Sequence, residues 1–182
     1  YGPEPVTTVQ ELPQTVLMNH MAQFPLDTLR QLAQRVWNRH QCDQVISRDD
    51  LQWLRTHCPG VKIIVSSASP QPVLEAAAKQ LGVDAIAYSH VEEFDGYLST
   101  PAWLRPIFKQ RPPRRISPPK KLWMNSNHTK ITHLQKRFPE MFTEGAKTVG
   151  ITDTSYGEDH CWADHFERVI DVNSTAPFSP VV

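Results

Sequence analysis

The sequence is poor in cysteine and has no excess of charge of either sign. Its three cysteines, Cys42, Cys58 and Cys161, are odd in number and far apart. This is not the pattern of a disulfide framework, and it favours a reducing, cytoplasmic setting. Lys plus Arg and Asp plus Glu number 19 each, so the overall charge attracts neither nucleic acid nor an anionic membrane. We therefore expect no nucleic-acid partner.

Long apolar runs are also lacking. No hydrophobic stretch approaches the roughly 20 residues that a membrane-spanning helix needs. The first residues, YGPEPVTTVQELPQ, show neither the basic nor the apolar region of a secretory signal, and we expect no membrane partner. With 182 residues and 40% hydrophobic content, the chain is long enough to bury the core of one domain and to form a small additional subdomain.

The first third of the chain is predicted to be helical. Apolar residues recur at intervals of three and four over residues 14–40, with Pro25 as the expected break between two helices. Ser47 is a typical N-cap for the next helix, which a Pro-Gly pair should end. Residues 1–56 are thus expected to form an extended leading segment and a helical region.

Strand and helix patterns alternate from Val61 onward. Short apolar segments predict strands at residues 61–65, 84–89, 121–125, 147–152 and 168–172. Helical patterns lie at residues 71–81, within 129–138 and around 159–166. Asp95 and Gly96 stand between residues able to form strands, which predicts a tight hairpin. The alternation predicts an α/β fold for residues 57–182, with a parallel sheet and helices on both of its faces.

Side chains that suit a phosphate group and a divalent cation lie at boundaries between predicted strands and helices. Ser66, Ser67 and Ser69 follow the first predicted strand and precede a helix, whose first N–H groups attract anions. Lys130 falls in the first turn of a predicted helix, where a cation opposes the helix dipole unless an anion compensates. Asp153 follows the fourth predicted strand and is an oxygen ligand suited to a hard cation. Together they form a predicted phosphoryl-binding set.

Each of these residues also has a purely structural interpretation. Ser69 before Pro70 is typical of a helix N-cap. Lys130 alone is typical of a solvated helix residue, and Asp153, followed by Thr, Ser, Tyr and Gly, is typical of a turn that leaves a strand. The order of the three, each at a boundary between strand and helix, favours the functional interpretation.

With these motifs the chain resembles the haloacid dehalogenase (HAD) superfamily, in particular its phosphoserine-phosphatase-like branch with an early helical cap. IIVSSASP is similar to the second family motif, with Ser67 as the favoured equivalent and Ser66 as the alternative. NHTKITHL, with Lys130, is similar to the third motif, and VGITDTSYGEDH, with Asp153, to the fourth. VEEFDGYLST resembles the hairpin between the second and third motifs. The resemblance covers residues 61 to about 175.

The resemblance implies a three-layer, Rossmann-like (HAD-like) α/β fold, with a parallel sheet, helices on both faces and an α-helical cap. Residues 1–56 would hold the extended leading segment and the cap, and residues 57–182 the core. Thr152 stands where the fourth motif usually has Gly. The first motif, DxDxT, is absent from the sequence; because it precedes the cap in this branch, we expect it, with the first strand and the nucleophilic aspartate, upstream of Tyr1.

The resemblance further implies a phosphoric monoester hydrolase that requires Mg²⁺ and acts on a small phosphorylated metabolite through a phospho-aspartate. The residues it implies are catalytic Ser67, Lys130 and Asp153; phosphate-binding Ser66, Ser67, Ala68 and Lys130; and metal-binding Asp153 and Asp159. Glu158 is the alternative for the second acid.

Three other interpretations stay open. Zinc could be bound by soft and imidazole ligands, although positions five apart on a helix do not share a face and no CxxC pair exists. The residues concerned are His160, Cys161 and His165, with His128 or His133.

The chain could also be a catalytically inactive HAD-like binding or interaction module. Residues 108–121, proline-rich with six cationic side chains and no acidic one, suit a solvated loop, a phosphate-attracting rim or an RNA contact.

Overall fold

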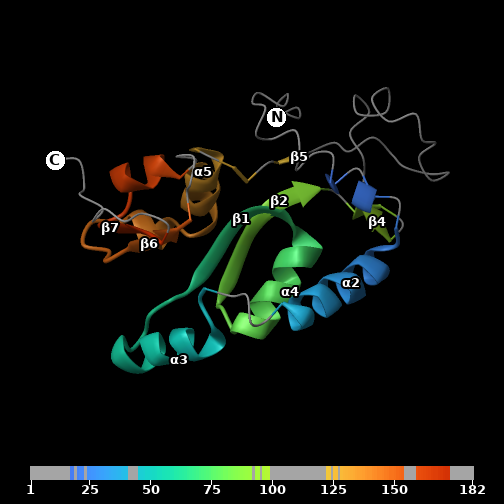
Figure 1. The fold of residues 1–182 in the computed structure, drawn as a ribbon. Coiled ribbons are helices and arrows are strands. Elements are labelled where there is room, and N and C mark those ends of the chain that lie inside the picture. The colour runs from blue at the N-terminus through green and yellow to red at the C-terminus, as the bar shows by residue number, and fades with distance from the viewer. Residues whose placement is uncertain are drawn as a thin grey trace. The chain divides into compact units, whose positions relative to one another are not determined.

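The chain divides into two units, Tyr1–Asn125 and Ser126–Val182, in the computed structural model (Figure 1). The residues that the structure describes are 17–18, 20–22, 24–40, 45–91, 93–94, 96–98, 122–123, 125–126, 128–153 and 159–172. Both units contain helices and strands, which confirms the mixed α/β class. The predicted boundary between cap and core, at residues 56 and 57, lies inside the first unit and stays a prediction.

The first unit is built on a small sheet, with one helix packed on the sheet and a second helix packed on the first. Its described elements are α2 (Leu26–Arg39), α3 (Arg48–His57), β1 (Ile64–Pro70), α4 (Gln71–Leu81), β2 (Ala85–Val91), β3 (Glu93–Phe94), β4 (Tyr97–Leu98) and β5 (Leu122–Trp123). The strand order in the sheet is β1-β2-β5. Since α4 contacts β1 and β2 and α2 packs against α4, α4 lies between the sheet and α2 (Figure 1).

The predicted parallel pairing is confirmed for β1 with β2 and is wrong for β5. β5 runs antiparallel to β2. Parallel neighbours need a crossover connection, usually a helix. The described residues between β2 and β5 form the β3–β4 hairpin instead, and antiparallel pairing needs no crossover.

The hairpin that the sequence predicts is present. Phe94 pairs with Tyr97 in antiparallel register, and Gly96 has a φ of 76°, a conformation that glycine adopts without strain. Asp95 lies outside the described residues. The Gly96 carbonyl accepts a hydrogen bond from the Leu26 N–H, with an N–O distance of 2.8 Å. The turn of the hairpin therefore holds the first residue of α2.

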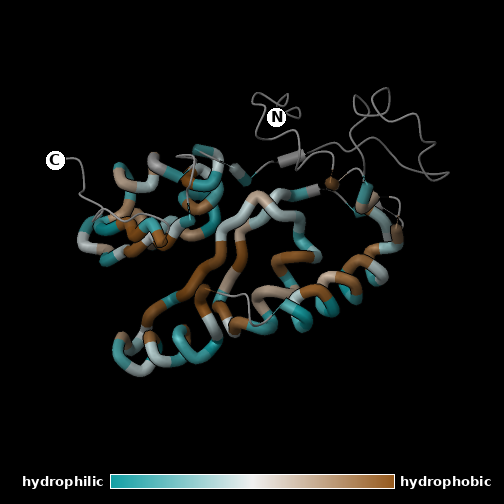
Figure 2. The backbone as a smooth tube through the Cα atoms, in the orientation of Figure 1, coloured by the Kyte–Doolittle hydropathy of each residue, from teal (hydrophilic) through white to brown (hydrophobic). Residues whose placement is uncertain are grey.

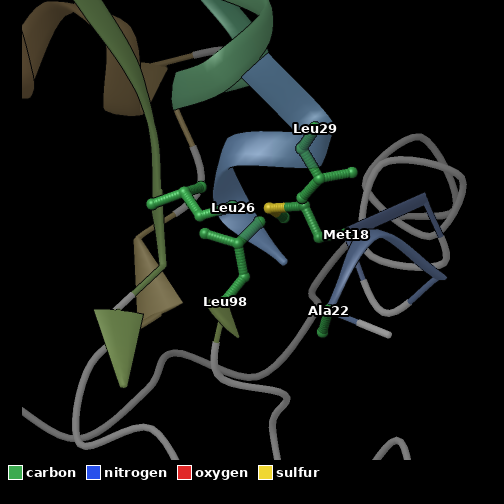
Figure 3. Close-up of a cluster of buried hydrophobic side chains, with 5 residues drawn as sticks. All are labelled: Met18, Ala22, Leu26, Leu29 and Leu98. Carbon is green, nitrogen blue, oxygen red and sulfur yellow. The ribbon is translucent and has the colours of Figure 1, made fainter. Parts of the chain in front are cut away.

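Apolar side chains join α2 to this hairpin (Figure 3). The buried cluster comprises Met18, Ala22, Leu26, Leu29 and Leu98, with Met21 packed against it. Pro25 directly precedes α2, which confirms the predicted break, because proline cannot continue the preceding helix by a hydrogen bond. Leu26 and Leu29, which belong to the three- and four-residue period seen in the sequence, thus pack α2 against Leu98 in β4.

Ser47 caps α3 as predicted. Its Oγ accepts from the Asp50 N–H at 3.2 Å, and Asp50 Oδ2 accepts from the Ser47 N–H at 2.7 Å and from its hydroxyl at 2.6 Å. These bonds form a capping box. The hydrogen bonds from Ser47 hold the pKa of the Asp50 carboxyl below its usual value.

The first turn of α3 should therefore loosen in acid. A carboxyl with a lowered folded-state pKa stabilises the fold fully above its unfolded pKa of about 3.9. That stabilisation is lost as the pH falls through the lower folded pKa. Amide-exchange protection in this turn should fall below about pH 4, and Asp50→Asn should remove the pH dependence. Asp49→Asn is the matched control, and protection that is independent of pH in the unsubstituted chain contradicts the prediction.

The second unit pairs two parallel strands beside one helix. Its described elements are α5 (His128–Arg137), η3 (Pro139–Phe142), β6 (Val149–Thr152), η4 (His160–Asp164) and β7 (Arg168–Asp171). The helix predicted around 159–166 is a short 3-10 helix, η4. The buried apolar side chains are Ile131, Leu134, Phe138, Trp162, Phe166 and Val169, and Figure 2 shows hydrophobic positions along β6 and β7. None of the described helices is long and apolar enough to span a membrane.

β6 brings its backbone close to two aromatic rings. A Cβ atom at Gly150 would lie 2.8 Å from Trp162 Cε3 and 2.9 Å from Phe166 Cδ2. The two rings meet edge to face with their centroids 5.4 Å apart, a favourable aromatic geometry. Glycine at this position lets both rings pack directly on the strand.

Gly150→Ala should lower the free energy of unfolding of the second unit by about 1–3 kcal/mol, because the added methyl group overpacks the contact. Urea denaturation followed by near-UV circular dichroism measures the loss. Val149→Thr, on the exposed face of the same strand, is the control and should stay within about 0.5 kcal/mol of the unsubstituted chain. A Gly150→Ala protein that is as stable as this control shows that the rings do not pack on β6.

Candidate functional site

The serine-rich segment after VKIIV is part of β1, whereas the sequence predicted that it would follow the strand. Ser66 pairs with Ala87 and Pro70 with Ser89, so four residue steps on β1 match two on β2. The residues between these pairs therefore bulge out of register, after the hydrophobic positions at the start of β1 (Figure 2). Since Pro70 still pairs with β2 and is itself the N-cap of α4, without a side-chain cap, the interpretation of Ser69 as the helix N-cap is wrong.

Ser67 is held within this bulge by a local hydrogen bond. Its Oγ accepts from the Ser69 N–H, with an N–O distance of 3.1 Å. A hydroxyl that accepts one bond keeps its own hydrogen to donate to another group. Ser66, Ser67 and Ala68 are all half-buried, so the segment is ordered by the sheet while part of it stays accessible.

Asn125 is the functional candidate that the sequence reasoning missed. It is fully buried, with 0% exposure. Its Nδ2 donates to Ser66 Oγ at 3.1 Å, to the Ser67 carbonyl at 2.9 Å and to the Ala87 carbonyl at 3.0 Å. The signal in the sequence was an amide at the end of the predicted strand KLWMN, a position where an apolar residue would be expected. The amide links β1 to β2 at the bulge.

Lys130 forms the central ion pair of the second unit. Its Nζ lies 2.7 Å from Asp159 Oδ1 and 2.8 Å from Asp159 Oδ2, and the Thr152 hydroxyl donates to Asp159 Oδ2 at 2.9 Å. The two charged side chains are only 12% and 8% exposed. Lys130 lies in the first turn of α5, as predicted. Asp159 is therefore the anion that offsets the unfavourable place of this cation in the helix dipole.

The ion pair interacts with one aromatic ring and affects one cysteine. The Lys130 Nζ lies 5.5 Å from the centroid of the Trp162 ring, within the range of a cation–π interaction. Burial, and then the negative charge of Asp159, raise the pKa of the Cys161 thiol. A raised pKa disfavours the thiolate that zinc binds. Among the described residues, no three His, Cys, Asp or Glu side chains group as a metal site.

Asp153 and Asp159, the two predicted metal ligands, differ in their surroundings. Asp153 follows β6 directly and is exposed, which fits an oxygen ligand for Mg²⁺ that keeps several waters. Asp159 already binds the Lys130 ammonium and the Thr152 hydroxyl, so its carboxylate serves here as a counter-ion to lysine. Glu158 lies outside the described residues. The metal role of both aspartates stays a prediction.

The six predicted site residues belong to different units. Ser66, Ser67 and Ala68 lie in the first, and Lys130, Asp153 and Asp159 in the second. Within the second unit, the structure brings Lys130 and Asp159 together. The convergence of Ser67 with Lys130 and Asp153 stays a prediction.

No protein-family model, curated protein or solved structure matches the chain. The resemblance to the HAD superfamily therefore depends on the motifs themselves. Of the residues in those motifs, Lys130 and Thr152 both bind the same carboxylate. Thr152, at the position where the resemblance would place a glycine, donates a hydrogen bond to Asp159.

Lys130→Met should destabilise the second unit by about 3–5 kcal/mol, because it leaves the Asp159 carboxylate buried without its counter-charge. Urea denaturation of the purified chain measures this. Lys136→Met is the matched control: it removes an exposed lysine from the same helix and should change stability by no more than about 0.5 kcal/mol. Adding Asp159→Leu to Lys130→Met should restore most of the loss. Equal stability of the two Lys→Met proteins contradicts a buried ion pair.

Proposed function

We propose that the protein is a HAD-type phosphatase that hydrolyses a small phosphorylated metabolite in an Mg²⁺-dependent reaction. The observation that carries the proposal is the buried ion pair of Lys130 with Asp159 in the first turn of α5. A buried lysine ammonium needs a carboxylate partner, and here the partner is Asp159, which belongs to the acidic segment VGITDTSYGEDH that begins in β6. A lysine with only a solvation role gains nothing from such burial.

Each residue has a defined task in the proposed reaction. The Ser67 hydroxyl donates to a non-bridging phosphate oxygen, and Lys130 offsets the charge that develops on the transferring group. Asp153 would hold Mg²⁺, which, when bound, neutralises further oxygen charge. An aspartate outside these 182 residues attacks phosphorus and expels the alcohol, and water then hydrolyses the phospho-aspartate to release phosphate and regenerate the carboxylate.

The proposal extends to the fold. It assigns residues 57–182 to a three-layer HAD-like core and residues 1–56 to a helical cap that excludes water and selects the substrate. α2, in the proposed cap, is tied to the core by Arg30, whose Nε donates to Glu75 Oε2 on α4 at 3.0 Å. A second guanidinium nitrogen of Arg30 lies 3.7 Å from Glu93 Oε1 in β3. These contacts would set where the cap rests.

Asp153→Asn tests the proposal in the protein made from the whole reading frame, with the nucleophilic aspartate included. Because Asp153 is exposed, the substitution should leave stability within about 0.5 kcal/mol. Loss of a residue that supports a metal ligand from the outer shell typically weakens metal affinity roughly 10- to 100-fold. Because Asp153 is proposed to bind Mg²⁺ directly, its loss should weaken Mg²⁺ affinity by at least as much. Calorimetry with Mg²⁺ and hydrolysis of 4-nitrophenyl phosphate measure both effects. Asp164→Asn, an exposed carboxylate on η4, is the control.

Two outcomes contradict the proposal. If the unsubstituted protein binds phosphate but does not hydrolyse the aryl phosphate, the HAD-like binding module replaces the enzyme. If Asp153→Asn lowers only the melting temperature and leaves Mg²⁺ affinity unchanged, Asp153 belongs to a turn and not to a metal site.

A further inference from the structure

Asn125 occupies the place where β1 and β2 leave their regular register. Its neutral amide has two N–H donors, and three acceptors surround the nitrogen: Ser66 Oγ, the Ser67 carbonyl and the Ala87 carbonyl, at 2.9 to 3.1 Å. One hydrogen is therefore shared between two acceptors in a three-centre hydrogen bond. The acceptors come from both strands, so the amide bridges the gap that the bulge opens in the ladder.

The position of Asn125 is itself set by β2. Its backbone N–H donates to Ser89 Oγ at 3.0 Å, and Ser89 is buried to 99%, with 1% exposure. Ser89 also pairs with Pro70, where β1 rejoins β2. One serine therefore fixes both the end of the bulge and the residue that spans it.

Two hydrogen bonds therefore fix Ser67, one at its carbonyl and one at its hydroxyl oxygen. Its carbonyl binds Asn125 Nδ2, and its hydroxyl oxygen accepts from the Ser69 N–H. Fixing the carbonyl sets the direction of the peptide plane, and the bond to Ser69 sets the side-chain torsion. The hydroxyl hydrogen is then left pointing in a restricted set of directions, which is the condition for a pre-organised donor.

We propose that Asn125 is a positioning residue that orients the Ser67 hydroxyl toward a phosphate oxygen. The inference rests on the proposed function, since it takes Ser67 as the phosphate-binding hydroxyl. Asn125 does not touch the phosphate itself: it acts through the Ser67 carbonyl and the shape of the bulge. Affinity for phosphate should then depend on Asn125 only while the Ser67 hydroxyl is present.

A double-mutant cycle measures that dependence, with inorganic phosphate as the probe and Mg²⁺ present at the same saturating concentration for every variant. Isothermal calorimetry gives the dissociation constant for the unsubstituted chain, Ser67→Ala, Asn125→Ala and the double variant. Loss of one hydrogen bond to a charged group should weaken binding by at least about tenfold in Ser67→Ala. Asn125→Ala should weaken it to a similar degree, and the double variant should be no weaker than Ser67→Ala alone.

A purely structural role for Asn125 predicts a different pattern, which two further variants reveal. Ala77→Gly, at a position in α4 outside the bulge, lowers the stability of the same unit by about 1 kcal/mol or more and should leave phosphate affinity unchanged. Ser89→Ala removes only the acceptor of the Asn125 N–H. It should reproduce part of the Asn125→Ala effect, and it carries the test if Asn125→Ala does not fold.

The outcomes separate the inference from the proposed function. If Ser67→Ala weakens phosphate binding while Asn125→Ala and Ser89→Ala bind normally, or if the losses are additive, Asn125 is not a positioning residue and the proposed function stands. If Ala77→Gly weakens binding as much as Asn125→Ala, the effect is one of stability and the inference is overturned. If Ser67→Ala binds phosphate as well as the unsubstituted chain, or if the chain does not bind it, the proposed role of Ser67 fails and the inference fails with it.

Discussion

The first unit depends on one buried amide, that of Asn125. β1 has to keep its pairing with β2 up to Pro70 and still release its serine-rich residues from register. A bulge alone disrupts the ladder locally and leaves residues unpaired, and unpaired polar groups are expensive when buried. Asn125 supplies donors at that place from a third segment of the chain. The bulge is therefore stable because a residue distant in sequence reaches it.

The second unit depends on charge compensation in a place with little water. Lys130 and Asp159 are buried together, so each would carry a large desolvation cost without the other. β6 contributes to this through the alternation of its side chains. Thr152 points inward and donates to Asp159, whereas the next residue, Asp153, is exposed. The end of β6 and the residue after it thus present a buried hydroxyl and an accessible carboxylate at neighbouring positions.

The sequence predicted the features whose causes are local. Pro25 marks the start of α2, Ser47 caps α3, and Gly96 turns the hairpin because each acts through its own backbone or the next few residues. Strand pairing depends on segments far apart in the chain, so the bulge in β1 and the antiparallel direction of β5 escaped prediction. Lys130 was singled out because a cation in the first turn of a helix opposes the helix dipole, and no neighbouring residue in the sequence explains its presence there. The resemblance singled out Asp159 as a metal ligand, but no local feature of the sequence pairs it with a lysine 29 residues earlier.

The ion pair also constrains how the proposed site can bind a phosphate monoester, whose charge is about −1.5 to −2 at neutral pH. Asp159 balances the charge of Lys130 before a ligand binds, so the pair as a whole adds little net positive charge with which to attract the ligand. Lys130 then acts on the phosphoryl group at short range, through its ammonium hydrogens and their local field. Within the proposed function, the missing positive charge has to come from a metal ion, and Asp153, the exposed carboxylate that follows Thr152 in the chain, is the proposed ligand. Phosphate affinity and Mg²⁺ affinity are then linked, because each ligand neutralises the charge that opposes binding of the other.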